Sequence, residues 1–163
     1  MTLSAPVPLA GHHLLDGFRC GEPDLDHWLI RRARANQVSG ATRTFVVCDD
    51  GRVVAYYALA SGGVATLAAT GRFRRNMSDP VPVAILARLA IDTSWQGRGL
   101  GRSLFQDCAR RLSQAADLLG IRGILVHALT PQARDFYLRL GIDPSPLDPM
   151  ILMVRLDDMR EAL

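Results

Sequence analysis

A glycine-rich stretch followed by a helical pattern is the part of this sequence whose residue types and spacing best suit chemistry. The stretch reads Gln96-Gly97-Arg98-Gly99-Leu100-Gly101. Glycines let a ligand approach the backbone closely, and the N–H groups at the start of a following helix attract negative charge. We therefore interpret the stretch as a loop that can bind a pyrophosphate. A tight turn between a strand and a helix would explain the glycines as well.

Two other nucleotide-binding patterns are disfavoured by the spacing. The stretch lacks the third glycine of the dinucleotide fingerprint at the required distance. It also lacks the Gly-Lys-Ser/Thr ending of the phosphate loop in ATPases.

Arginine supplies the other candidate anion-binding groups, because the sequence contains no lysine. Its planar fork can bind phosphate through two hydrogen bonds at once. The clusters Arg31-Arg32-Ala33-Arg34, Arg72-Phe73-Arg74-Arg75 and Arg110-Arg111 could hold a polyanion. A solvated face is the alternative for each.

The elements before the glycine stretch are predicted from periodicity. Asp24 to Val38 carries an apolar stripe at helical spacing and predicts an amphipathic helix. Thr42 to Cys48 and Arg52 to Ser61 are rich in β-branched and aromatic residues and flank Asp49-Asp50-Gly51, which predicts a hairpin. Gly62 to Pro80 is predicted as loop or short helix, and Val81 to Ile91 as a buried central strand.

Helices and strands alternate after the glycine stretch. A long helix is predicted from the glycine stretch up to Gly120, then a strand over Gly123 to Leu129, a helix from Pro131 through Leu140 and a last strand over Met150 to Arg155. This order predicts an α/β fold with a mixed sheet and helices on both faces. With 163 residues and no linker composition, one domain over residues 1–163 is expected.

Composition excludes several classes of protein. Apolar stretches fall far short of the roughly 20 residues of a membrane-spanning helix. The N-terminus has neither a basic nor a sustained apolar segment, so a cytoplasmic protein is expected. The 3 cysteines and 4 histidines lack metal-site spacing, so no metal and no disulfide are predicted.

Two motifs around these elements resemble those of a known family. Arg88-Leu89-Ala90-Ile91-Asp92 and the glycine stretch that follows resemble motif A of the GNAT superfamily of N-acetyltransferases, and Ala133-x-x-Phe136-Tyr137-x-x-Leu140-Gly141-Ile142 resembles its motif B. The resemblance implies acetyl-CoA as cosubstrate. It implies that the backbone of Leu89, Ala90 and Ile91 pairs with pantetheine and that the pyrophosphate is bound by the loop from Gln96 to Arg102, that is by Gln96, Gly97, Arg98, Gly99, Leu100, Gly101 and Arg102. Tyr137 aligns with a tyrosine that protonates the leaving thiolate; a core aromatic residue is the alternative.

A narrower resemblance covers most of the chain. Phe18-x-Cys20-Gly21, Leu25-Asp26-x-Trp28-Leu29, Ala35-Asn36-Gln37, Arg74-Arg75-Asn76-Met77 and Pro144-Ser145-Pro146 resemble the acetyltransferase toxins of bacterial toxin–antitoxin modules. The resemblance implies acetylation of the α-amine of aminoacyl-tRNA, a block of translation, a small DNA-binding antitoxin as partner and a homodimer. It implies that Asn36, Arg74 and Arg75 bind the acceptor. Ile142 stands where phenylalanine is common.

Direct attack by the amine is the expected mechanism. An α-amine has a pKa of about 8, so a useful fraction is neutral near pH 7 without a strong base. An acetyl-cysteine route is disfavoured because Cys20 and Cys48 lie outside both motifs and Cys108 lies on the apolar stripe of the long helix. The alternatives left open are acetylation of a small amine or a protein N-terminus, and a non-catalytic acyl-CoA-binding regulator.

Overall fold

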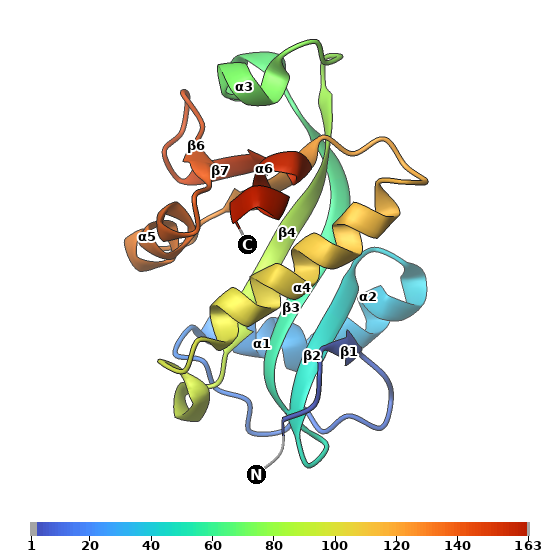
Figure 1. The fold of residues 1–163 in the computed structure, drawn as a ribbon. Helices are drawn as coiled ribbons and strands as arrows, with labels where there is room; N and C mark the ends of the chain where they lie inside the picture. Colours follow the sequence, from blue (N-terminus) through green and yellow to red (C-terminus); the bar gives the residue numbers. More distant parts are fainter. Residues whose placement is uncertain (1–2, 163) are drawn as a thin grey trace. The chain divides into compact units, whose positions relative to one another are not determined.

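The computed structural model describes residues 3–162, with side chains up to residue 159. In this part of the chain seven strands form a sheet in the order β1-β2-β3-β4-β5-β7-β6 (Figure 1). The strands are β1 (Val7–Pro8), β2 (Arg43–Asp49), β3 (Arg52–Val64), β4 (Val81–Ile91), β5 (Gly123–His127), β6 (Asp143–Pro144) and β7 (Ile151–Arg155). The helices are α1 (Pro23–Arg31), α2 (Ala33–Ser39), α3 (Gly71–Arg74), α4 (Leu100–Ala115), α5 (Pro131–Arg139) and α6 (Leu156–Ala162), with 3₁₀ turns at Thr66–Ala68 and Thr93–Trp95.

The sheet is mixed, as the sequence predicted. β4 and β5 pair in parallel, whereas β2 with β3 and β5 with β7 pair in antiparallel fashion. The chain divides into two compact units, one of Met1–Ala60 with Ala87–Asp107 and the other of Ser61–Leu86 with Cys108–Leu163. β3, β4 and α4 each contribute residues to both units.

The first unit contains the predicted hairpin. β2 and β3 pair from Arg43↔Leu59 to Asp49↔Arg52, and the turn between them has Asp50 and Gly51 at φ 51° and 80°. Positive φ at both central residues matches the right-handed twist of the two strands. The core of this unit gathers apolar side chains of α1, β2 and β3, among them Leu29, Val46 and Tyr56.

The predicted helix over Asp24 to Val38 was wrong in one respect, since α1 and α2 are separate. The chain leaves helical geometry at Arg32, whose φ is −123°. Beyond Ala33 the apolar stripe gives way to polar residues, so nothing holds one straight helix on the core. The bend brings Gln37 to the first strand of the hairpin, where its Oε1 accepts from the Thr44 N–H at 2.7 Å.

The second unit carries the rest of the sheet and its own core. Phe73, Val81, Val83 and Met153 are buried there together. The segment predicted as loop or short helix contains α3, and Thr70 caps it by accepting from the Phe73 N–H at 3.2 Å. β3 runs on to Val64, three residues past the predicted end at Ser61.

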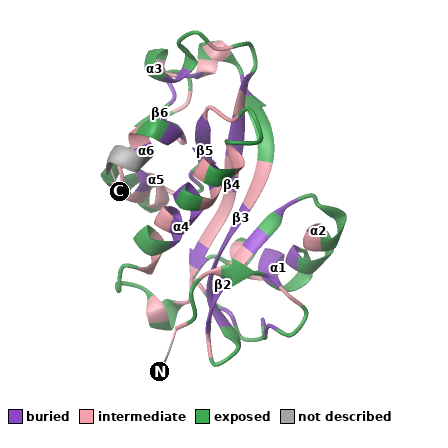
Figure 2. Cartoon of the chain, turned by 45° about the vertical axis from the view of Figure 1, so that its right-hand side comes forward, coloured by how far each residue is buried: buried purple, intermediate pink, exposed green. Residues whose placement is uncertain are grey.

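Several element ends differ from prediction. α4 ends at Ala115, β5 ends at His127 and β7 begins at Ile151. The two-residue strands β1 and β6 and the helix α6 were not predicted. Short edge strands carry too little pattern to be read from sequence. Along β4 no residue is exposed, in agreement with the predicted buried strand (Figure 2).

One carboxylate links three elements of the second unit. Asp158 of α6 accepts from Arg155 of β7 at 2.9 Å through both oxygens. It also accepts from Arg72 of α3 at 3.0 and 2.7 Å. Hydrogen bonds from these two guanidinium groups hold the pKa of Asp158 well below its ordinary value.

We expect Asp158→Asn to lower the free energy of unfolding at pH 7 by about 1 kcal/mol, because Arg72 is largely exposed and water screens the pairing. A lowered pKa stabilises the fold above the unfolded value of about 4, and this contribution declines as the pH falls from there through the lower pKa of the folded state. Urea unfolding of both proteins at pH 7 and pH 3 measures the effect, with the exposed Asp135→Asn as control. A stability difference as large at pH 3 as at pH 7 would contradict the assignment.

Among the described residues no helix is long and apolar enough to span a bilayer.

Candidate functional site

The end of β4 is followed by a tightly bonded turn. Asp92 Oδ1 accepts from the Ser94 N–H at 3.0 Å and from its hydroxyl at 2.7 Å, while Oδ2 accepts from the Arg19 N–H at 3.1 Å. Burial raises the pKa of Asp92, but the hydrogen bonds from Ser94 and Arg19 outweigh burial and hold it below the ordinary value. A charged Asp92 therefore fixes the point at which the chain leaves the strand.

Gln96, the first residue of the glycine stretch, uses its side chain for structure. Its Nε2 donates to the carbonyl oxygens of Ile91 and Cys20, each at 2.8 Å. The side chain thus holds the start of the loop against the end of β4. Gln96 can offer a ligand its backbone N–H rather than its amide side chain.

Two glycines of the loop adopt a backbone conformation that favours glycine. Gly97 and Gly99 lie at φ 78° and 82°, in the region that side chains with a Cβ atom disfavour. No atom lies within 4 Å of a Cβ built at either position, so the backbone there is open. α4 begins at Leu100, and its 16 residues place the loop amides at the positive end of a long helix.

Two arginines belong to this loop. The Arg98 guanidinium lies 4.7 Å from the centre of the Trp95 ring, and Arg102 is exposed on the first turn of α4. The exposed loop, the helix amides and these cations together form a site suited to a pyrophosphate.

The three strand residues before the loop lie at the end of β4. Ala90 is buried in the core of the first unit, and Leu89 and Ile91 are half-buried. Pairing of β4 with β5 runs from Val83 to Leu86, whereas β4 itself continues to Ile91. The pairing of β4 with β5 therefore ends before the residues that are predicted to bind pantetheine.

Tyr137 lies in the second unit, near the end of α5. Thr130 caps this helix by accepting from the Ala133 N–H at 3.1 Å, and Pro131 occupies its first turn, as predicted. Tyr137 is 6% exposed and its ring meets that of Phe136 edge-on, with centroids 5.1 Å apart. Burial, and secondarily the Cys108 thiol, raise the pKa of Tyr137 above its ordinary value. The hydroxyl is therefore protonated at neutral pH and has a proton to donate.

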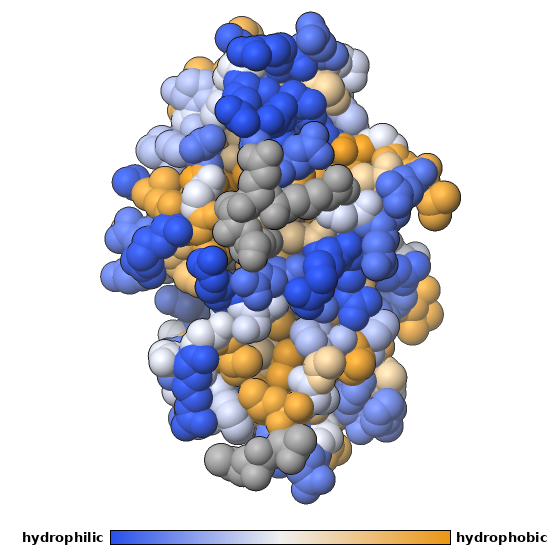
Figure 3. All heavy atoms as spheres, viewed as in Figure 1, coloured by the Kyte–Doolittle hydropathy of each residue, from blue (hydrophilic) through white to orange (hydrophobic). Residues whose placement is uncertain are grey.

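The residues predicted to bind the acceptor fall in different units. Arg74 ends α3 and Arg75 follows it; both are exposed, and Arg74 also donates to the Thr66 carbonyl at 3.2 Å. The surface over α3 is hydrophilic (Figure 3). Asn36 is half-buried on α2 in the first unit, with the loop and the end of β4.

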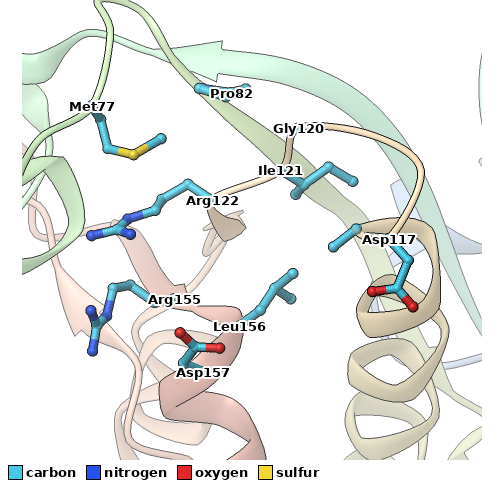
Figure 4. A pocket seen from close by; sticks show the side chains of 10 residues that line it. Met77, Pro82, Asp117, Gly120, Ile121, Arg122, Arg155, Leu156 and Asp157 are labelled. Atoms are coloured by element: carbon cyan, nitrogen blue, oxygen red, sulfur yellow. The ribbon is translucent and has the colours of Figure 1, made fainter.

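A cavity of about 360 Å³ lies in the second unit, between Met77, Arg122, Arg155 and Leu156 (Figure 4). It contains none of the predicted site residues. Arg122 also donates to the carbonyls of Phe73 and Arg72 at 2.8 and 3.0 Å, and these two hydrogen bonds hold α3 in place. This residue was not predicted from the sequence, because a lone arginine before a strand carries no signal of a distant partner.

Within residues 3–159 no three side chains of histidine, cysteine, aspartate or glutamate gather as a metal site requires. In the same range no cysteine forms a disulfide; Cys48 and Cys108 are buried and Cys20 is half-buried.

Known proteins resemble this chain over its whole described length. A tRNA-acetylating toxin of Mycobacterium tuberculosis is 53% identical over 160 residues, which cover 98% of this chain and 96% of the relative. A structure of AtaT complexed with acetyl-methionyl-tRNAfMet superposes with a TM-score of 0.90 at 25% identity and covers 98% of both chains.

A second structure of AtaT, a tyrosine-to-phenylalanine mutant bound to the C-terminus of the antitoxin AtaR and to acetyl-CoA, gives a TM-score of 0.84 at 25% identity. It covers 99% of this chain and 97% of the other. The family model described as an acetyltransferase (GNAT) domain matches residues 40–141, which include the glycine loop and Tyr137. The chain therefore belongs to the GNAT family of acetyltransferases.

Proposed function

We propose that this chain is a toxin that transfers the acetyl group of acetyl-CoA to the α-amine of an aminoacyl-tRNA and thereby stops translation. The open glycine loop at the start of α4 carries the proposal, because it supplies backbone donors for the coenzyme's pyrophosphate. The 53% identity to a tRNA-acetylating toxin supports the choice of acceptor.

The coenzyme-binding roles follow from the chemistry of the chain. The backbone N–H groups from Gln96 to Arg102 bind the pyrophosphate, and Arg98 and Arg102 add positive charge. Backbone groups of Leu89, Ala90 and Ile91 bind pantetheine, since pairing of β4 with β5 ends at Leu86 and the strand runs on. Acetyl-CoA supplies the acetyl group as a thioester.

Tyr137 donates to the sulfur that leaves. The amine nitrogen forms the new amide bond and releases a proton to solvent, the carbon–sulfur bond breaks, and the sulfur gains the proton of Tyr137. Solvent then returns a proton to the Tyr137 phenol. A phenol whose pKa is raised stays protonated near neutral pH and is ready for this role. The remaining acceleration comes from positioning of the amine and the thioester.

Arg74, Arg75 and Asn36 bind the acceptor in this proposal. Replacement of Arg74 and Arg75 by alanine is expected to weaken tRNA binding at least tenfold and to flatten its salt dependence, because each phosphate contact releases counterions. Affinity for acetyl-CoA should stay unchanged, because both residues lie outside the glycine loop. Titration of total tRNA across a salt series measures the effect, with the exposed Arg43→Ala, Arg52→Ala pair as control. Equal tRNA affinity in both double variants would mean that Arg74 and Arg75 are solvated surface residues that do not bind tRNA.

The proposal also places the protein in the cytoplasm, where charged tRNA is used, with an antitoxin as its protein partner. One GNAT domain over residues 1–163 is part of it, supported by relatives that match nearly the whole chain.

One experiment tests the function directly. Total charged tRNA is incubated with the protein and radiolabelled acetyl-CoA, and the labelled aminoacyl adenosine is identified after nuclease digestion. Label on the amino acid of a charged tRNA is expected. Label in protein or in small amines only would replace the proposal with another acetyltransferase activity, and no transfer at all would favour a non-catalytic acyl-CoA-binding regulator.

A further inference from the structure

Arg88 is a charged residue within an otherwise apolar strand. β4 reads Val81-Pro82-Val83-Ala84-Ile85-Leu86-Ala87-Arg88-Leu89-Ala90-Ile91, and every residue in it is buried or half-buried. A cation at such a position costs free energy unless a partner or a ligand compensates it. Its surroundings therefore bear on function.

The contact of Arg88 is aromatic. Its guanidinium carbon lies 4.3 Å from the centre of the Trp28 ring, and Trp28 stacks in turn on Tyr56 at 5.9 Å with an angle of 13°. Ala90, two residues further along β4, lies in the same core cluster as Trp28 and Tyr56, as the alternation of a strand requires. Arg88 thus lies on the face of β4 that α1 covers.

Stacking leaves the donors of Arg88 available. A cation–π contact uses the flat face of the guanidinium, whereas its N–H groups point outward along the edge. Among the described residues no carboxylate is paired with Arg88. Trp28 therefore fixes the plane of the Arg88 guanidinium, and the N–H groups along its edge remain available to a ligand.

The position along the strand suggests which ligand. Under the proposed function the pyrophosphate lies at the glycine loop, and pantetheine runs back from it past Ile91, Ala90 and Leu89. The thioester end then lies toward Leu89 and Arg88, where the acceptor must deliver its amine. The oxygens next to that amine in a charged tRNA belong to the single-stranded 3′ end.

We infer that Arg88, held flat by Trp28, binds a phosphate of the single-stranded 3′ end of the acceptor tRNA. The inference rests on the proposed function and adds a contact beside the reacting groups to those of Arg74 and Arg75. The planar fork suits a phosphate through two hydrogen bonds, a geometry that lysine does not offer.

The test is a binding cycle with total tRNA, intact or trimmed of its single-stranded 3′ end, in the presence of saturating coenzyme A. Arg88→Met is expected to weaken binding of intact tRNA about tenfold and that of trimmed tRNA little, because only the intact form carries the contacted phosphate. The salt slope for intact tRNA should fall by about 0.7, the value for one phosphate of a single strand. Arg52→Met, which removes an exposed arginine of the same unit, should change neither.

Arg88→Lys keeps the charge and should restore the salt slope while intact tRNA still binds more weakly than to the wild-type protein. If Arg88→Met fails to fold, the lysine variant decides alone: affinity for intact tRNA equal to wild type would overturn the inference. So would Arg88→Met weakening trimmed and intact tRNA equally, or weakening only coenzyme A. A wild-type protein that acetylates no charged tRNA would refute the proposed function instead, whatever Arg88 does.

Discussion

Tyr137→Phe is expected to lower the single-turnover rate of acetyl transfer by roughly 10² to 10⁴, the usual contribution of a general acid. The substitution removes only the hydroxyl. The ring stays buried at the end of α5 with its edge-on contact to Phe136. Affinity for acetyl-CoA should therefore change little, and the loss should fall on the chemical step.

The measurement is single turnover at saturating acetyl-CoA, with circular dichroism to confirm folding. Tyr57→Phe is the matched control. It removes a buried hydroxyl that donates to Asp107 at 2.6 Å, so it should lower the melting temperature and leave the rate within a few fold. Equal rates for Tyr137→Phe and the wild-type protein would make Tyr137 a core aromatic residue and remove it from the catalytic machinery.

Gly99→Val is expected to weaken acetyl-CoA binding by about 10² or more. Gly99 lies at φ 82°, where a β-branched residue costs on the order of 1–3 kcal/mol, and relief of that strain moves the loop amides away from a ligand. The new side chain also occupies the open space through which the pyrophosphate approaches. Because no atom lies within 4 Å of the added Cβ, the fold itself should tolerate the change.

Calorimetric titration with acetyl-CoA gives the affinity, and thermal unfolding shows whether the variant is folded. Gly11→Val serves as control, since a Cβ at Gly11 likewise meets no atom within 4 Å but Gly11 has no left-handed φ. Gly99→Ala should lie between valine and glycine. Unchanged affinity in folded Gly99→Val would exclude the loop as the pyrophosphate site.

Local signals made the loop, the hairpin and β4 predictable. Asp50 and Gly51 adopt the turn that their types favour, and β4 is a long apolar run with turn signals at both ends. The glycine loop was found because glycine spacing and the helix after it are both local.

Tertiary contacts explain what the sequence did not reveal. The break at Arg32 places Gln37 where its side chain accepts from the Thr44 N–H. The side chain of Gln96 binds the carbonyl of Cys20, a residue 76 positions away. Arg122 holds α3 from the start of β5. Each is a hydrogen bond made by one side chain to another segment, which no periodicity encodes.

The hydrogen bonds of Asp158 make the C-terminal helix a mechanical support for the surface around α3. Through one carboxylate, α6 holds Arg72 directly, and Arg72 stands two residues before Arg74. A fused tag, a cleavage or a bound protein that pulls α6 away would remove this support and leave the hydrogen bonds from Arg122 to hold α3, without a change at Arg74 or Arg75. Amide hydrogen exchange in α3 would then accelerate, so a change at α6 would alter the surface proposed to bind the acceptor from a distance.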